Sequence, residues 1–408
     1  MKLKLSTSQH TASGYVREID ALRGIAVLAV MLFHAEPAWL SGGFAGVDVF
    51  FVISGYLITR IILVDLNKEG FNFLKFWERR ARRILPALFA VLIPCTILAW
   101  LYFSPTELRG FSASAIASLG FGGNFYFWQE AGDYFAQDAG KKPLLHLWSL
   151  GVEEQFYLVF PVILLVLWKF ARSKIGLALS AGAILSFGLA WYAAHNHPSA
   201  AFFIPFTRAW ELAAGSLLAV YTARGRLPLK AHSTAIVLVS LTAMAATFAL
   251  AGEKTAWPGP FALPIIAATV AVIAYGPYGG ATRKVLQFRP LVLIGLASYG
   301  IYLWHHVLLS FVRIISPSEM RFHELAVVLL ISIGLGGASY AWIEQPARNR
   351  QLLPARQFWL GACTLMTLLL AANLWIWQQN GSPDRLPKRL QLIAAMPEKY
   401  PSKIDRCF

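Results

Sequence analysis

Residues 15–35 read YVREIDALRGIAVLAVMLFHA, a charged segment followed by an apolar run that contains a histidine, His34, near its end. With the residues up to Leu40, the run comes close to the roughly 20 apolar residues that a membrane-spanning helix needs. Residues 1–15 contain no hydrophobic run and no cleavage site of the kind found in signal peptides. We therefore expect 24–40 to serve as both targeting signal and membrane anchor.

Ten further apolar runs follow. The eleven predicted spans cover residues 24–40, 44–64, 84–103, 146–168, 175–194, 203–221, 233–251, 261–277, 289–312, 324–343 and 357–377. The first, second and sixth spans are the weakest, because they contain His34, Asp48 and Glu211 and polar groups are costly inside a bilayer.

The composition supports this assignment. The 408 residues are 57% hydrophobic and 14% charged, with a mean hydropathy of +0.55, whereas soluble proteins carry about 25% charged residues. A cytosolic enzyme and a disordered protein are excluded, and three cysteines are too few for a disulfide scaffold. The predicted fold is an all-α polytopic membrane protein with about 11 transmembrane helices, a ten-helix core plus one extra helix.

The net charge of +15 comes from 36 Lys and Arg against 21 Asp and Glu. If the N-terminus is cytoplasmic, 23 of the basic residues fall on the inner side, 7 on the outer side and 6 in the tail after Trp377. This bias is typical of membrane topology, so we expect no nucleic-acid partner. It predicts a cytoplasmic N-terminus and an outward, periplasmic C-terminus, with residues 378–408 forming a proline-containing linker.

Arg23 and His34 are eleven positions apart, which is close to three helical turns and about 16 Å along the axis. They therefore share one helix face, with Arg23 at the cytoplasmic mouth and His34 deep in the span. This spacing suits a long phosphorylated ligand that places its phosphate at the arginine and its reactive end at the histidine. The structural alternative is a snorkelling arginine and a hydrogen-bonded core histidine.

Further ionisable groups lie near or inside the predicted spans. Asp48 either orients His34, the arrangement of a general base, or is capped by the backbone or by Ser54. The cluster FWERRARRILP supplies basic residues for binding either the phosphates of a ligand or anionic lipid headgroups: Arg79, Arg80, Arg82 and Arg83.

In LLHLWSLGVEEQFYLVFP, His146 and Glu153 lie two turns apart on one face, which favours a functional role. Residues 104–143 form the longest outer loop; we interpret its aromatic residues as an interfacial belt, with a sugar-facing surface as the alternative. Arg208 with Glu211 and Glu344 with Arg348 are predicted structural pairs. No metal-binding motif, phosphate-binding loop or GxSxG motif is present, so we predict no metal.

The chain resembles the membrane acyltransferase-3 family over residues 15–350. The matching stretches include the run from Arg23 to His34, FWERRARRILP, LLHLWSLGVEEQFYLVFP, ASYGIYLWHH and WIEQPAR. Arg23 and His34 occur in the family's R-x10-H pattern. The resemblance implies acyl transfer from cytoplasmic acetyl-CoA to a sugar hydroxyl at the outer face. It also implies that His34 is the essential catalytic residue and that Arg23, Arg80 and Arg82 bind the donor.

The extra span and outward tail look like the subgroup whose membrane domain precedes an extracytoplasmic SGNH domain and whose acceptors include lipopolysaccharide O-antigen. We accordingly expect an acyltransferase domain at 1–350, an added helix at 351–377 and a periplasmic tail at 378–408. An SGNH domain is expected beyond the tail, although no GDS-type motif follows it.

The resulting hypothesis is an inner-membrane O-acetyltransferase of a surface polysaccharide or its lipid-linked precursor. His34, oriented by Asp48 or Glu153 with His146 nearby, is the general base or an acyl relay. Arg83 joins the donor-binding arginines, and Tyr302 and His305 stabilise the oxyanion. A transporter or flippase of a lipid-linked glycan, or an acyltransferase acting on a lipid or peptide, remains the alternative.

Overall fold

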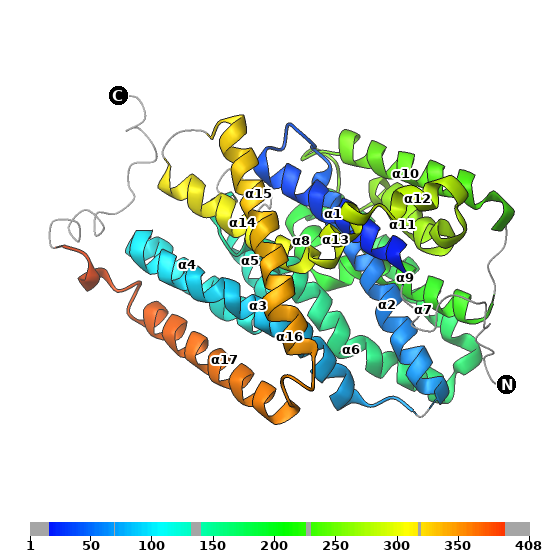
Figure 1. The fold of residues 1–408 in the computed structure, drawn as a ribbon, viewed down its shortest axis with the longest axis horizontal. Helices are drawn as coiled ribbons and strands as arrows, with labels where there is room; N and C mark the ends of the chain where they lie inside the picture. Colours follow the sequence, from blue (N-terminus) through cyan, green and yellow to red (C-terminus); the bar gives the residue numbers. More distant parts are fainter. Residues whose placement is uncertain (1–15, 69, 132–139, 226–229, 317–319, 388–408) are drawn as a thin grey trace.

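The computed structural model describes residues 16–68, 70–131, 140–225, 230–316 and 320–387, and within these ranges every regular element is helical (Figure 1). The first eight α-helices are α1 (Arg17–Ala35), α2 (Gly46–Lys68), α3 (Phe73–Tyr102), α4 (Pro105–Leu119), α5 (Gly123–Ala131), α6 (Trp148–Phe170), α7 (Ile175–Asn196) and α8 (Pro198–Phe203). The others are α9 (Pro205–Ala223), α10 (Ser233–Leu250), α11 (Leu263–Tyr275), α12 (Gly280–Leu286), α13 (Arg289–Leu296), α14 (Ser298–Ile315), α15 (Phe322–Ser339), α16 (Gln345–Arg348) and α17 (Ala355–Gln378).

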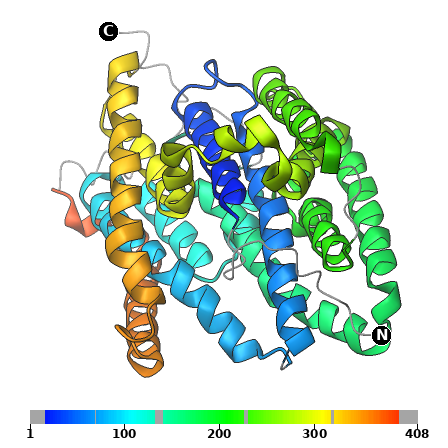
Figure 2. The ribbon, with the colours of Figure 1, turned by 45° about the vertical axis from the view of Figure 1, so that its right-hand side comes forward.

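The described part of the chain has eight helical stretches long and apolar enough to cross a membrane, or nine if the bent pair α13–α14 is one span. The prediction of a multi-pass helical membrane protein is therefore supported, whereas the count of eleven is not confirmed. Each predicted run does overlap a helix, but α1 and α9 fall short by these criteria. Both carry buried charged groups, such as Asp20 in α1 and Glu211 in α9. In Figure 2, α1 lies among other helices.

The predicted span 289–312 is broken. Helices α13 and α14 meet at Ala297 with a bend of 72°. Close packing on α1 accompanies the break: a methyl group at Gly295 would overlap the carbonyl oxygen of Asp20, so the two helices meet backbone to backbone. The break brings the first turn of α14 beside the second turn of α1, where Arg23 lies.

Residues 104–143, predicted as an outer loop, contain the helices α4 and α5 instead. Helix α4 begins at a capping box in which Ser104 and Glu107 exchange side-chain and backbone hydrogen bonds. The turn after α4 is held by Gln155 of α6, whose amide donates to the Phe121 carbonyl at 2.8 Å. The added helix α17 packs along α4 and α3 at the edge of the molecule (Figure 1). Local capping thus produces helices where the sequence pattern suggested a loop.

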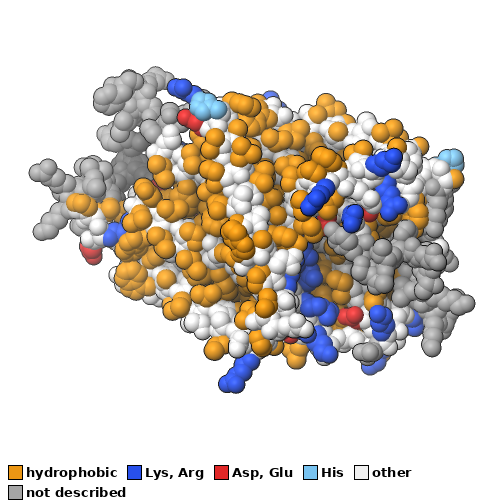
Figure 3. Space-filling view, viewed as in Figure 1, with side chains coloured by type: hydrophobic (Ala, Val, Ile, Leu, Met, Phe, Trp, Pro, Cys, Tyr) orange, Lys and Arg blue, Asp and Glu red, His pale blue; other side chains and the backbone are white. Residues whose placement is uncertain are grey.

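The surface is apolar over a broad band. On the face shown in Figure 3, hydrophobic side chains form this band and Lys and Arg gather toward its lower and right-hand edges. Exposed residues include Trp342 at 77% and Leu360 at 69%. Such a continuous apolar surface is suited to lipid rather than water.

Helices α2 and α9 form the tightest pair in the core. Gly55 of α2 faces the backbone of Leu212, and Gly215 of α9 faces the backbone of Val52, so a methyl group at either glycine would overlap a carbonyl oxygen. Ser216 adds an interhelical hydrogen bond from its hydroxyl to the Gly55 carbonyl at 3.3 Å. Small residues at such crossings let membrane helices approach closely.

Gly215→Ala is therefore expected to destabilise the protein by about 1–3 kcal/mol, because the added methyl group forces the two backbones apart. Gly188→Ala on α7 is the matched control, since nothing lies within 4 Å of its new methyl group. Thermal unfolding in detergent measures the difference. Equal stability of the two variants would contradict the close contact.

Candidate functional site

Four histidines from three parts of the chain form a cluster. His34 lies in the last turn of α1, His146 in the short helix Leu145–Leu147 before α6, and His305 and His306 on α14. The His34 ring centroid lies 5.2 Å from that of His305 and 4.8 Å from that of His306. The His146 ring lies 4.9 Å from the His306 ring. The sequence predicted that His34 lies deep in a longer span. Because α1 ends at Ala35, His34 lies near the end of its helix instead.

Hydrogen bonds to the backbone assign the tautomers in this cluster. His305 Nδ1 lies 3.2 Å from the carbonyl oxygen of Ile301, so Nδ1 carries the proton and Nε2 carries the lone pair. His305 Nε2 in turn lies 2.9 Å from His34 Nδ1. His34 therefore donates from Nδ1 to His305, and its own lone pair is on Nε2. His305 thus orients the imidazole of His34.

Arg313 holds the end of the helix that carries His34. Its Nη2 donates to the carbonyl oxygens of His34 at 2.6 Å and of Ala35 at 2.9 Å. A cation at a helix C-terminus also interacts favourably with the helix dipole. Because Arg313 belongs to α14, it ties α1 to the helix that carries His305.

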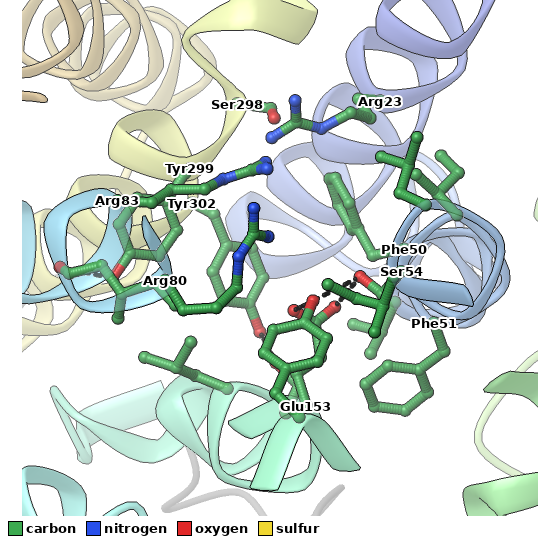
Figure 4. A pocket seen from close by; sticks show the side chains of 18 residues that line it. Arg23, Phe50, Phe51, Ser54, Arg80, Arg83, Glu153, Ser298, Tyr299 and Tyr302 are labelled. Carbon is green, nitrogen blue, oxygen red and sulfur yellow. Dashed lines mark hydrogen bonds between the residues drawn. The ribbon is translucent and has the colours of Figure 1, made fainter. Parts of the chain in front are cut away.

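A separate pocket contains three arginines. Arg23 of α1 and Arg80 and Arg83 of α3 line the same open pocket. Figure 4 shows their guanidinium groups pointing toward one another, with Ser298 of α14 beside Arg23. Among the described residues, none of the ion pairs involves Arg80 or Arg83. Of the three, only Arg23 has a carboxylate of the described residues at ion-pair distance, Asp20 at 3.5 Å.

Glu153 lies in this pocket. Its Oε1 accepts from the Ser54 hydroxyl at 3.0 Å and its Oε2 from the Tyr157 hydroxyl at 3.1 Å (Figure 4). Both oxygens are thus held by neutral groups of the pocket wall. The expectation that Glu153 orients His34 is wrong, because His305 holds His34 Nδ1 instead.

Tyr302 links the pocket to the histidine cluster. It lines the pocket together with Ser149, and its ring lies 5.3 Å from that of His146 and 5.4 Å from that of His305. Its hydroxyl donates to the His146 carbonyl at 2.8 Å and lies 2.8 Å from the Ser149 hydroxyl. The site thus has a cationic end and an imidazole end with Tyr302 between them.

Asp48 is not beside His34, contrary to one predicted arrangement. Its carboxylate pairs with Arg208 at 3.2 Å and accepts from the Trp257 indole at 3.2 Å. Arg208 also pairs with Glu211 at 3.3 Å, which confirms that predicted pair. All three charged residues are fully buried between α2 and α9. Asp48 therefore belongs to a structural ion triad of the core.

Arg82 is also structural in this arrangement. Its guanidinium donates to Glu78 and to the carbonyl oxygens of Ala347 and Leu353, each at 2.8 Å, and stacks on Phe358 of α17. It does not line the pocket, whereas its neighbours Arg80 and Arg83 do. Arg79 pairs with Asp65 at the surface. The predicted pair of Glu344 and Arg348 is confirmed at 2.6 Å.

Several residues that form the site were not among the predicted site residues. They are Ser54, Tyr157, Ser298, His306 and Arg313. Most of them give no signal in the sequence, because only the fold brings them together. Only the adjacent pair His305 and His306 within an apolar run was a visible hint.

The chain is similar in sequence to known O-acetyltransferases. The chain is 32% identical over 396 residues to O-acetyltransferase OatA of Staphylococcus aureus, covering 92% of this chain and 64% of that protein. It is 30% identical over 352 residues to peptidoglycan O-acetyltransferase OatA of Listeria monocytogenes, covering 82% of this chain and 56% of that protein. It is 31% identical over 353 residues to putative peptidoglycan O-acetyltransferase YrhL of Bacillus subtilis, with 82% and 55% coverage.

The chain thus spans about 55–64% of the length of these relatives. No solved structure matches it. The relatives whose names give an acceptor name peptidoglycan, so the expected lipopolysaccharide or O-antigen acceptor is not supported. The acyltransferase-domain family matches residues 16–343, a stretch that contains the arginine pocket and the complete histidine cluster, and the chain belongs to this family.

Proposed function

We propose that this protein is an O-acetyltransferase of the bacterial inner membrane. It takes an acetyl group from cytoplasmic acetyl-CoA and transfers it to a hydroxyl of a cell-surface glycan of the peptidoglycan class. The family match and the similarity to the named O-acetyltransferases support acyl transfer to such a glycan. The donor and the roles of individual residues are argued below from the geometry.

The convergence of Arg23, Arg80 and Arg83 is the observation that carries the proposal. Three guanidinium groups repel one another, and the pocket contains too few carboxylates at ion-pair distance to balance them. An anionic ligand removes this repulsion, and guanidinium groups bind phosphate oxygens in bidentate pairs. The phosphates of acetyl-CoA fit this end of the site, while anionic lipid headgroups are the competing ligand.

The reacting end lies beyond Tyr302. With its phosphates on the arginines, the donor extends its thioester toward the histidine cluster. His34 Nε2 takes the proton from the acceptor hydroxyl while the hydroxyl oxygen attacks the thioester carbonyl. The intermediate collapses, the C–S bond breaks, and the CoA thiolate receives the proton from His34. Alternatively, His34 Nε2 itself attacks the thioester carbonyl, and the C–S bond breaks to release the CoA thiolate. The acceptor hydroxyl then attacks the acetyl-imidazole, the C–N bond breaks, and the hydroxyl proton passes to the CoA thiolate.

His305 is a positioning residue in this mechanism. Because its Nδ1 proton is held by the Ile301 carbonyl, its Nε2 accepts from His34 and keeps the His34 lone pair on Nε2. This is the task that an aspartate performs in a catalytic triad. The Tyr302 hydroxyl already donates to the His146 carbonyl, so stabilisation of the oxyanion by Tyr302 requires that hydrogen bond to be exchanged.

His34→Ala is expected to abolish CoA release from labelled acetyl-CoA by purified protein in detergent and transfer of label to soluble peptidoglycan fragments. The expected loss is at least about 100-fold, the usual contribution of a general base. Calorimetric CoA binding should persist, since the arginine pocket is intact.

Two outcomes would contradict the proposal. Wild-type protein that neither binds CoA nor releases it would favour transport of a glycan or lipid. A His34→Ala variant with wild-type turnover would remove His34 from the chemistry.

Arg80 and Arg82 provide a matched pair two positions apart. Arg80→Gln is expected to weaken CoA binding by about 10–100-fold with unchanged thermal stability, since a hydrogen bond to a charged group contributes about 1.5–3 kcal/mol. Arg82→Gln should show the reverse pattern, lower stability and unchanged CoA affinity of the folded protein, because Arg82 satisfies backbone carbonyls rather than the pocket. Calorimetry and thermal unfolding measure the two effects. Weaker CoA binding by the Arg82 variant alone would reverse this assignment.

A further inference from the structure

The histidine cluster has the donor set of a metal site, although the sequence contains no metal-binding motif. His34, His305 and His306 each present one ring nitrogen, and these three atoms lie within 4.8 Å of one another. A tetrahedral zinc ion with Zn–N bonds of about 2.0–2.1 Å requires ligand nitrogens roughly 3.3 Å apart. Small side-chain rotations therefore bring the three nitrogens onto one ion. The motif search missed the site because α1 and α14 are remote in the chain.

Backbone carbonyls hold two of the three rings in the orientation that metal ligands need. His305 donates from Nδ1 to the carbonyl of Ile301 at 3.2 Å. His306 donates from Nε2 to the carbonyl of Lys142 at 3.1 Å. Their lone pairs are therefore on His305 Nε2 and His306 Nδ1. Metal-binding histidines almost always donate their other nitrogen to such a carbonyl or to a carboxylate.

An unsatisfied ring nitrogen in the same place points to a ligand. His306 Nδ1 is buried and has no hydrogen-bond partner among the residues that the structure describes. A buried polar atom without a partner costs about 1–3 kcal/mol. Coordination of an ion satisfies His306 Nδ1 directly.

We propose that His34, His305 and His306 bind a divalent transition-metal ion of the zinc class. Three neutral imidazoles are a known ligand set for zinc, with the fourth position left to water or another ligand. When the ion binds His34 Nδ1, the proton on that atom moves to Nε2. His34 then has no lone pair with which to accept a proton from a hydroxyl. Metal binding and acetyl transfer therefore exclude one another, a consequence that rests on the proposed function.

The site is tested by binding, independently of activity. Chelator-treated wild-type protein in detergent is titrated with Zn²⁺ by calorimetry and with Co²⁺ by visible absorption, which reports tetrahedral coordination. One ion per chain is expected. His306→Ala should weaken binding at least tenfold, since even the groups that hold a metal ligand in place contribute about 10–100-fold. His195→Ala is the control, because His195 is exposed on α7 and its Nδ1 hydrogen-bonds the Trp191 carbonyl of its own helix.

His306→Asn serves as the second variant if the alanine variant does not fold, because asparagine retains a donor for the Lys142 carbonyl. Absence of Zn²⁺ binding by wild type, or equal affinity in the folded His306 variant and wild type, would overturn the site.

Measurements of CoA release test whether metal binding and acetyl transfer exclude one another. We expect Zn²⁺ to suppress CoA release by wild type and a chelator to restore it. The His306 variant should need at least tenfold more Zn²⁺ for the same fractional loss of activity, with the rate of each protein compared with its own metal-free rate. Unchanged or faster release in the zinc-bound protein would overturn the exclusion while leaving the site. A wild-type protein that releases no CoA with or without metal would instead refute the proposed function, and the binding measurements would still decide the site.

Discussion

The hydrogen bond between His34 Nδ1 and His305 Nε2 joins two helices whose residues are 271 positions apart, and the geometry of the site depends on it. Helix α1 carries His34 at one end and Arg23 near the other. Helix α14 carries His305 in its middle and begins with Ser298 beside the same arginine (Figure 4). One helix pair thus contributes to both ends of the site. Arg313 fixes the far end of this pair through the carbonyl oxygens of His34 and Ala35.

Buried charge in this protein falls into two kinds. Arg208 is enclosed by partners of its own, namely Asp48, Glu211 and aromatic rings. Arg82 is likewise held by a carboxylate and two carbonyl oxygens. In a low-dielectric interior, removal of one partner would leave an uncompensated buried charge and destabilise the fold. These two guanidinium groups are thus paired within the fold itself.

Arg80 and Arg83 are different, because their guanidinium groups face a cavity and form none of the ion pairs among the described residues. Keeping such cations close together opposes folding, which is why the proposed function assigns them an anionic ligand. The difference between Arg80 and Arg82, two positions apart on one helix, is one of orientation. Successive positions on an α-helix turn by about 100°, so residues two apart point in nearly opposite directions.

Composition and periodicity were sufficient to predict the helical membrane class, because a bilayer permits few alternatives to long apolar helices. They were also sufficient for the local pairs of Arg208 with Glu211 and of Glu344 with Arg348, which are set by helical spacing. The break at Ala297 and the partners of Asp48 were beyond prediction. Both depend on contacts between segments remote in the chain, such as Gly295 against Asp20 and Asp48 against Arg208.

The spacing of Arg23 and His34 acquires its meaning only from these remote contacts. Eleven helical residues place the two side chains about 16 Å apart on one face of α1. Along that face, α3 adds Arg80 and Arg83 at the Arg23 end, and α14 adds His305 at the His34 end. Tyr302 lines the arginine pocket, and its ring lies 5.4 Å from that of His305. The helix therefore sets the distance between the arginine end and the histidine end of the site. Under the proposed function, a ligand that uses both ends must be elongated, anionic at one end and reactive at the other.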